Sequence, residues 1–167
     1  MDCELKAPIS EDDWKVYHKI RREVLFEARG RYGVYDEQHP DEHVEGNYPQ
    51  IYSVSGEIIG VVRIDLERLK HQATFRRLAI REDKQRNGYG RYLMMAAEAF
   101  ASANSCPYFI ANVSLDAIGF YEQIGYRLDP ENPENDAKNP RMIKPSKDLS
   151  QMIRLLIPDS LLSNFWE

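Results

Sequence analysis

Apolar residues recur at helical spacing in three parts of the chain, which begin or end with residues that suit helix termini. The first helix is predicted to follow Ser10, which fits a capping box with Asp13, and to end at Gly30. The second is predicted over residues 88–100 and the third over residues 116–124. The segments between them have a different period.

Several short runs are rich in β-branched and aromatic residues or alternate apolar with polar positions, as strands do. Two such runs flank Ser55-Gly56 and predict a hairpin over residues 51–68. The polar segments 31–49 and 129–148, which contain Gly or Pro, are predicted to be loops, the first with a short helical turn. Further strands are predicted at residues 3–9, 73–80, 107–113 and 151–157.

The resulting order of elements, β-α-β-β-β-α-β-α-β, differs from the regular alternation of a doubly wound sheet. Three consecutive antiparallel strands followed by a β-α-β unit predict an α+β fold. Its mixed, mostly antiparallel sheet would be flanked by helices on both faces. The length of 167 residues and the 43% hydrophobic content predict one domain over residues 1–167, with enough apolar side chains for a core.

The composition argues against several classes of protein. A formal net charge of −5 does not suit general nucleic-acid binding, which requires a concentrated basic surface. Cys3 and Cys106 lie in no CxxC pair or histidine-rich cluster, so we expect no disulfide framework and no metal site, and a buried Cys106. No apolar run approaches the roughly 20 residues of a membrane span, and the chain starts without an apolar signal core. We therefore expect a cytoplasmic protein without a membrane partner.

One segment has the pattern of an anion site. A predicted strand turns into the helix that begins at Gly88, and the first turn of a helix has unpaired N–H groups and positive partial charge. Gly88 would let a phosphate approach the backbone, Gly90 would keep the first turn open, and Arg86 and Arg91 could add charge. On glycine spacing alone, an ordinary turn at Asn87-Gly88 is an equal alternative.

The same segment, Gln85–Gly90 (QRNGYG), resembles the Arg/Gln-x-x-Gly-x-Gly/Ala signature of the GNAT superfamily of N-acetyltransferases. A second segment, Ala117–Tyr126 (AIGFYEQIGY), is similar to that family's A-x-x-F-Y-E-x-x-G-F. The two matches have the right order and spacing, and the resemblance covers residues 58–128 well. It implies an enzyme that transfers the acetyl group of acetyl-CoA to a primary amine, which attacks the thioester directly.

The resemblance also implies which residues bind acetyl-CoA. The strand before the loop would pair its backbone with the pantetheine arm, and the loop with the first helical turn would hold the pyrophosphate. Polar residues that follow the strand at residues 107–113, or end it, would also reach the cofactor. The predicted cofactor-binding residues are Leu78, Ala79, Ile80, Gln85, Arg86, Asn87, Gly88, Tyr89, Gly90, Arg91, Asn112 and Ser114.

Tyr121 stands where the family places its general acid, which gives a proton to the departing thiolate. The reference pKa of a tyrosine, about 10, is near the value of about 8.5 for a thiol. The alternative is a ring that only packs on the sheet. Some family members have a glutamate upstream of the loop, but residues 73–77 hold no carboxylate. The general base is therefore open between Asp65, Glu67, His71, a water relay and an amine that arrives neutral.

The acceptor would be a small-molecule or peptide amine. The segment 35–45 has five carboxylates and is either an acidic mouth for a cationic amine or a solvated loop. Two other functions are alternatives: a non-catalytic coenzyme A-binding sensor or interaction module, and an acyl-homoserine-lactone-type acyltransferase, which would want a basic surface for a carrier protein. The apolar tail at residues 161–166 would either cover the core or form a homodimer contact.

Overall fold

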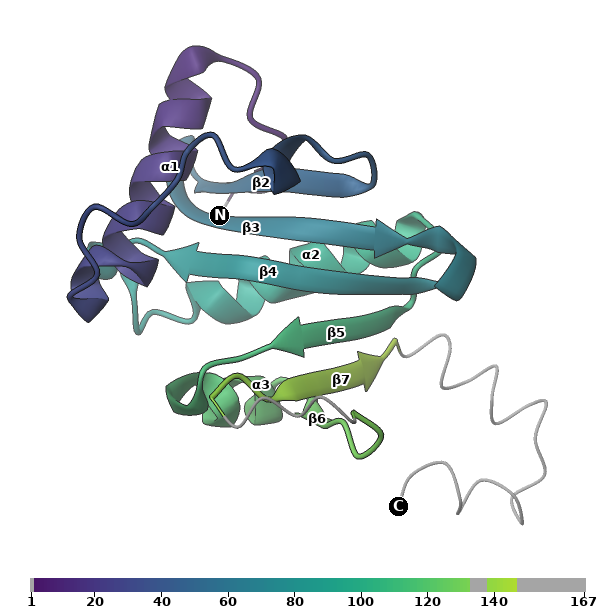
Figure 1. The fold of residues 1–167 in the computed structure, drawn as a ribbon. Helices are drawn as coiled ribbons and strands as arrows, with labels where there is room; N and C mark the ends of the chain where they lie inside the picture. Colours follow the sequence, from purple (N-terminus) through teal and green to yellow (C-terminus); the bar gives the residue numbers. More distant parts are fainter. Residues whose placement is uncertain (1, 133–137, 147–167) are drawn as a thin grey trace, which may run out of the picture.

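The computed structural model describes residues 2–132 and 138–146, and within them a seven-stranded mixed sheet forms the centre of the molecule (Figure 1). The strand order is β1-β2-β3-β4-β5-β7-β6, and all neighbours are antiparallel except β4 and β5, which are parallel. The predicted α+β class and the mostly antiparallel sheet are confirmed. The strands are β1 (Cys3–Lys6), β2 (Asn47–Val54), β3 (Glu57–Glu67), β4 (Gln72–Ile80), β5 (Tyr108–Asn112), β6 (Arg127–Leu128) and β7 (Arg141–Pro145).

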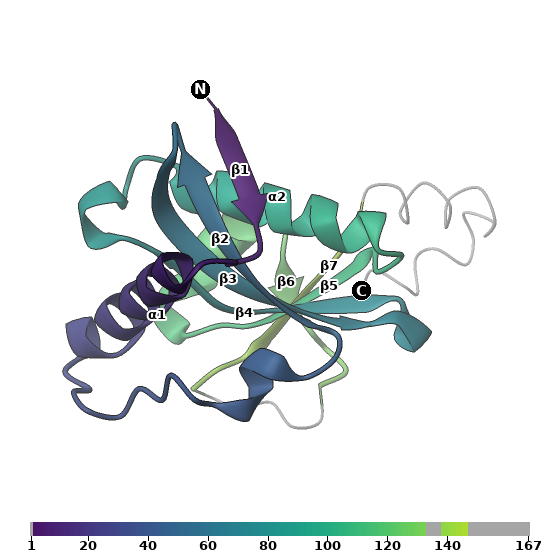
Figure 2. The ribbon, with the colours of Figure 1, turned by 90° about the horizontal axis from the view of Figure 1, so that it is seen from above.

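Helices cover both faces of the sheet (Figure 2). On one face, α1 (Glu11–Leu25) packs Tyr17 and Ile20 in a buried cluster with residues of β2, β3 and β4. On the other, α2 (Tyr89–Ala103) and α3 (Ile118–Gln123) contribute to the larger buried cluster. The predicted capping box at the start of α1 is present, and after α1 a 3₁₀ turn ends at Gly30, whose φ is 74°. Within the described residues, no helix is long and apolar enough to span a bilayer.

The hairpin of β2 and β3 turns at Ser55 and Gly56, which both have positive φ, as expected for a two-residue hairpin loop. The next pair of strands is less regular. Opposite the single residue between Val61 and Arg63, β4 has two residues, and one of them, Arg77, has a φ of 57°. This β-bulge breaks the alternation of side chains along β4.

The two parallel strands separate toward their carboxyl ends. Pairing between β4 and β5 covers Gln72–Phe75 on β4 and ends at the pair Phe75 and Ala111 (Figure 1). Beyond that pair, β4 continues to Ile80 without β5 beside it. The backbone of β4 is therefore open on one side within the sheet.

The prediction of a continuous loop over residues 129–148 is wrong. Arg141–Pro145 forms β7, which pairs antiparallel with β5 and with the two-residue strand β6. Only Met142 and Ile143 are apolar in this stretch, and prolines bound it on both sides, so its local sequence does not predict a strand. The open edge of β5 determines its structure by burying these two side chains. The predicted strand at 151–157 and the apolar tail at 161–166 lie outside the described residues.

Candidate active site

The start of α2 follows a tight loop that is stabilised by its own side chains. Gly88 is the N-cap residue of α2, with a left-handed φ of 81°. The Asn87 amide donates to the carbonyl oxygens of Lys84 and Gln85, at 3.2 and 2.9 Å. The Gln85 amide donates to the carbonyl of Ile80, at 2.9 Å. These two side chains fix the loop that carries the helix start.

A hollow of about 410 Å³ opens beside this helix start. The first turn of α2 supplies backbone N–H groups that have no intrahelical partner. A Cβ added to Gly90 would lie 3.4 Å from the ring of Phe120, so α3 packs closely against this turn. The hollow is lined by Ile80, Lys84, Gln85, Arg86, Gly88, Tyr89, Gly90, Arg91, Phe120, Gln123 and Ile124.

Seven of the predicted cofactor-binding residues line this hollow: Ile80, Gln85, Arg86, Gly88, Tyr89, Gly90 and Arg91. Asn87 acts in the loop instead, while Leu78 and Ala79 lie on β4 before the hollow. Ser114 is the N-cap residue of the 3₁₀ turn before α3, where its side chain makes no capping hydrogen bond but helps to lower the pKa of Asp116. Lys84, Phe120, Gln123 and Ile124 also line the hollow, although the sequence did not predict them as cofactor-binding residues. Phe120 and Gln123 lie on α3 and Ile124 directly follows it, at the helical spacing of the second motif.

Tyr121 lies on α3 and lines neither this hollow nor the larger cavity described below. Its ring makes edge-on contacts with Phe120 and Tyr126, at centroid distances of 5.2 and 5.3 Å. Burial raises the pKa of Tyr121 to about 12, so the phenol is protonated at neutral pH. Within the described residues, its hydroxyl makes no hydrogen bond, which leaves the proton available to a ligand.

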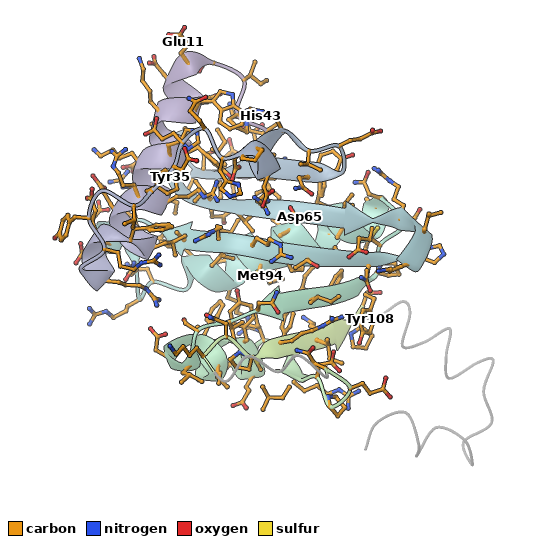
Figure 3. All side chains as sticks on the ribbon, in the orientation of Figure 1. Glu11, Tyr35, His43, Asp65, Met94 and Tyr108 are labelled. Carbon is orange, nitrogen blue, oxygen red and sulfur yellow. The ribbon has the colours of Figure 1, made fainter. Side chains whose placement is uncertain are left out.

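A larger cavity of about 820 Å³ lies between the α1–β2 connection and the face of β3 and β4. Figure 3 labels two of its lining residues, Tyr35 of the connection and Asp65 of β3. Asn112, at the end of β5, also lines this cavity rather than the hollow at α2. The cavity reaches β4 at residues 75–77, next to the point where β5 separates.

A buried ion cluster supports the cavity. Glu42, from the 3₁₀ turn Pro40–His43, accepts hydrogen bonds from the Tyr17 hydroxyl at 2.8 Å and from the Arg21 guanidinium at 2.5 Å. Arg63 of β3 adds a third contact at 3.3 Å. Burial opposes the charge of Glu42, but Arg21 and the hydrogen bonds outweigh it, so the pKa of Glu42 is lowered.

Of the two alternatives for residues 35–45, an acidic mouth and a solvated loop, neither describes all five carboxylates. Of these carboxylates, Glu42 is neutralised inside the protein, and Glu37 pairs with Arg22 at 2.9 Å. Asp41 lies 3.8 Å from Arg63. Only Asp36, Asp41 and Glu42 of the five line the cavity.

The three residues considered for the general base lie in different places. Asp65 lines the cavity, but it is held by Arg63 at 2.7 Å and Arg76 at 2.9 Å. Glu67 accepts from Lys70 and Gln72, and the His71 ring contacts a backbone carbonyl 3.2 Å away. Neither Glu67 nor His71 lines the cavity.

Comparisons with known proteins agree with this geometry. The family model of the Acetyltransferase (GNAT) family matches residues 14–126. A search of curated proteins gives no match. Solved structures at low identity share the fold. An acyl-CoA N-acyltransferase from Pseudomonas aeruginosa is 17% identical with a TM-score of 0.68, covering 86% of this chain and 98% of that one.

Two further structures extend the comparison. The PaiA N-acetyltransferase of Thermoplasma acidophilum, solved in complex with coenzyme A, is 14% identical with a TM-score of 0.64, covering 87% of this chain and 99% of that one. A chimera of the Vibrio cholerae spermidine N-acetyltransferase SpeG is 16% identical with a TM-score of 0.69, covering 92% and 99%. At these identities, the similarity establishes the fold alone.

Proposed function

Because the chain belongs to the Acetyltransferase (GNAT) family, we propose that it transfers the acetyl group of acetyl-CoA to a primary amine. The observation that carries this proposal is the hollow at the start of α2, where Gly88 adopts a left-handed conformation beside unpaired first-turn N–H groups. The coenzyme A bound to the Thermoplasma acidophilum relative supports the same cosubstrate here.

The residues present fit the phosphates of acetyl-CoA. The first turn of α2 would donate backbone N–H groups, while Arg86 and Arg91 at the rim would add charge-assisted hydrogen bonds. From this hollow, the open side of β4 leads to the larger cavity at residues 75–77. A thioester held along that edge would therefore meet an amine bound in the larger cavity. Acetyl-CoA would supply the activated acetyl group for transfer.

Transfer forms a bond between the amine nitrogen and the acetyl carbon and breaks the bond from that carbon to sulfur. The leaving sulfur carries negative charge, and a nearby donor stabilises it. Tyr121 is proposed for this role, because its hydroxyl is protonated and makes no hydrogen bond within the described residues. Its pKa of about 12 exceeds that of a thiol, about 8.5, so hydrogen-bond donation is favoured over full proton transfer.

The amine would lose its proton without a dedicated strand carboxylate. Asp65 is held by two arginines, and Glu42 by Arg21, Arg63 and Tyr17. Both carboxylates are therefore already occupied by guanidinium groups. We propose that water in the open cavity takes a proton from a cationic amine before attack, or that the amine binds in its neutral form. In either case the N–H proton that is lost as the amide forms passes through water to the leaving thiolate.

One observation favours a second function, a coenzyme A-binding sensor without catalysis. Tyr121 lines neither cavity, and its ring is packed between two other rings. The two functions are separated by measuring free thiol released from acetyl-CoA in the presence of amino acids, polyamines, aminoglycosides and peptide N-termini. Amine-dependent thiol release supports the transferase. Tight acetyl-CoA binding without release for any amine supports the sensor.

A further inference from the structure

Two arginines of the larger cavity, Arg31 and Arg77, have no carboxylate partner in the part of the chain that the structure describes. The guanidinium carbons of Arg31 and Arg77 lie 4.8 and 5.2 Å from the centroid of the same ring, that of Phe26. Within the described residues, neither forms an ion pair with a carboxylate. Two cations therefore contact the same apolar ring, and no carboxylate of the described residues pairs with either.

The bulge in β4 explains how Arg77 reaches this place. Neighbouring side chains of a regular strand point to opposite faces, yet Arg76 and Arg77 both line the cavity. The left-handed φ of 57° at Arg77 breaks that alternation. Arg76 is neutralised by Asp65 at 2.9 Å, so the bulge adds a second, unmatched cation on the same side.

Arg31 and Arg77 differ in this respect from the other arginines of the cavity. Those other arginines are matched: Arg21 by Glu42, and Arg63 and Arg76 by Asp65. Burial lowers the pKa of Arg77, and the like charges of Arg21 and Arg63 lower it further. A bound anion would relieve this repulsion.

One carboxylate of the cavity, that of Asp36, also makes no ion pair with any residue that the structure describes. Asp36 lies in the α1–β2 connection, and its side chain accepts from the backbone N–H of Gln38 at 2.9 Å. Its negative charge is therefore available to a cation. The cavity offers groups for both an anion and an ammonium.

We propose that the acceptor is an amine that also bears a carboxylate, of the amino-acid type, and that this carboxylate binds Arg31 and Arg77. The inference rests on the proposed acetyl transfer and names its acceptor class. Guanidinium groups match the planar geometry of a carboxylate and form charge-assisted hydrogen bonds with it. A polyamine has no anion to offer and would add positive charge beside arginines, which costs binding energy.

The test measures binding and does not depend on turnover. Protein saturated with free coenzyme A is titrated by calorimetry with N-acetylated amino acids, each paired with the carboxamide that lacks the negative charge. We expect the carboxylate to bind about tenfold or more tightly in at least one pair. Two further ligands form the other arms of the test: N-acetylphosphoethanolamine carries a phosphate in place of the carboxylate, and N-acetylspermidine is a polyamine. Equal affinity within every pair, no binding, or tighter binding of either arm overturns the inference.

Variants locate the effect. Arg31→Gln and Arg77→Gln should each weaken the preferred carboxylate about tenfold, leaving the carboxamide and acetyl-CoA affinities unchanged. Arg29→Gln is the matched control, because Arg29 is an exposed arginine outside the cavity lining. An equal loss in the control overturns the assignment. If the protein prefers the carboxylate ligand but releases no thiol with any amine, the proposed acetyl transfer is refuted and the carboxylate site stands. If it acetylates polyamines alone, the carboxylate site is refuted and the proposed acetyl transfer stands.

Discussion

Replacement of Glu42 by alanine should destabilise the protein strongly. The Glu42 side chain is 2% exposed and that of its partner Arg21 is 4% exposed, so the substitution leaves a buried guanidinium without a counter-charge. Breaking a buried pair in this way costs about 3–5 kcal/mol. Because Arg63 keeps Asp65, the penalty falls mainly on Arg21, and we expect the lower end, about 3 kcal/mol.

Urea and thermal unfolding measure this loss. For a chain of this size, about 3 kcal/mol corresponds to a fall of about 6–12 °C in Tm. Glu37→Ala is the matched control, because its carboxylate pairs with Arg22 but is 49% exposed, and we expect a loss below about 1 kcal/mol. Replacing both buried partners, as Arg21→Met with Glu42→Leu, should recover most of the loss. A Glu42→Ala variant no less stable than the control would refute the desolvated cluster.

The same pair predicts a dependence on pH. Burial raises the pKa of Glu42, but Arg21, Tyr17 and Arg63 together outweigh this effect, so the pKa is lowered below its ordinary 4.5. Its ionisation therefore stabilises the fold fully above pH 4.5, and this contribution is lost as pH falls through the folded-state pKa. The difference in unfolding free energy between wild type and Glu42→Gln should be constant near neutral pH and shrink in acid. A difference that grows in acid would contradict the lowered pKa.

Three further outcomes test the site and the packing around it. Gly88→Val should weaken acetyl-CoA binding at least tenfold in calorimetry, whereas Gly33→Val, with the same left-handed backbone but outside the lining of the hollow, should not. Tyr121→Phe should lower kcat about tenfold or more with little change in the KM for acetyl-CoA; wild-type turnover would mean that the ring only packs. Gly60→Ala should cost about 1–3 kcal/mol in urea unfolding, because the new Cβ would lie 2.7 Å from the Ile80 side chain; a smaller loss would mean that this side chain moves aside.

The sequence was most informative where structure depends on nearby residues. The capping box of α1, the turn at Ser55-Gly56 and the helix start at Gly88 each rest on a few adjacent positions, and all three are present. The two GNAT-like motifs lie where the resemblance implied, with the loop before α2 and Phe120 of α3 lining one hollow. Local backbone preference and helix-end chemistry act over such short distances.

The features that the sequence did not predict depend on distant partners. Glu42 stands in a polar segment, and only Tyr17, Arg21 and Arg63, which are distant in sequence, make it a buried group. The bulge that turns Arg77 into the cavity arises from the register of β4 against β3. This register produces no pattern of apolar and polar residues by which the sequence could have predicted the bulge. The neighbouring sequence of Glu42 or Arg77 does not indicate that the residue is buried or faces a cavity, because both properties depend on contacts with residues distant in sequence.

The open side of β4 beyond Phe75 also bears on how this protein can diverge. Every residue type presents a backbone carbonyl, and every type except proline presents an N–H. Binding of the acetyl donor through that backbone would therefore tolerate many side-chain replacements at residues 76–80. The acceptor cavity consists largely of side chains, several of them from the α1–β2 connection. Under the proposed acetyl transfer, changes in that connection would therefore alter which amine is accepted, while the backbone contacts to the acetyl donor would be inherited unaltered.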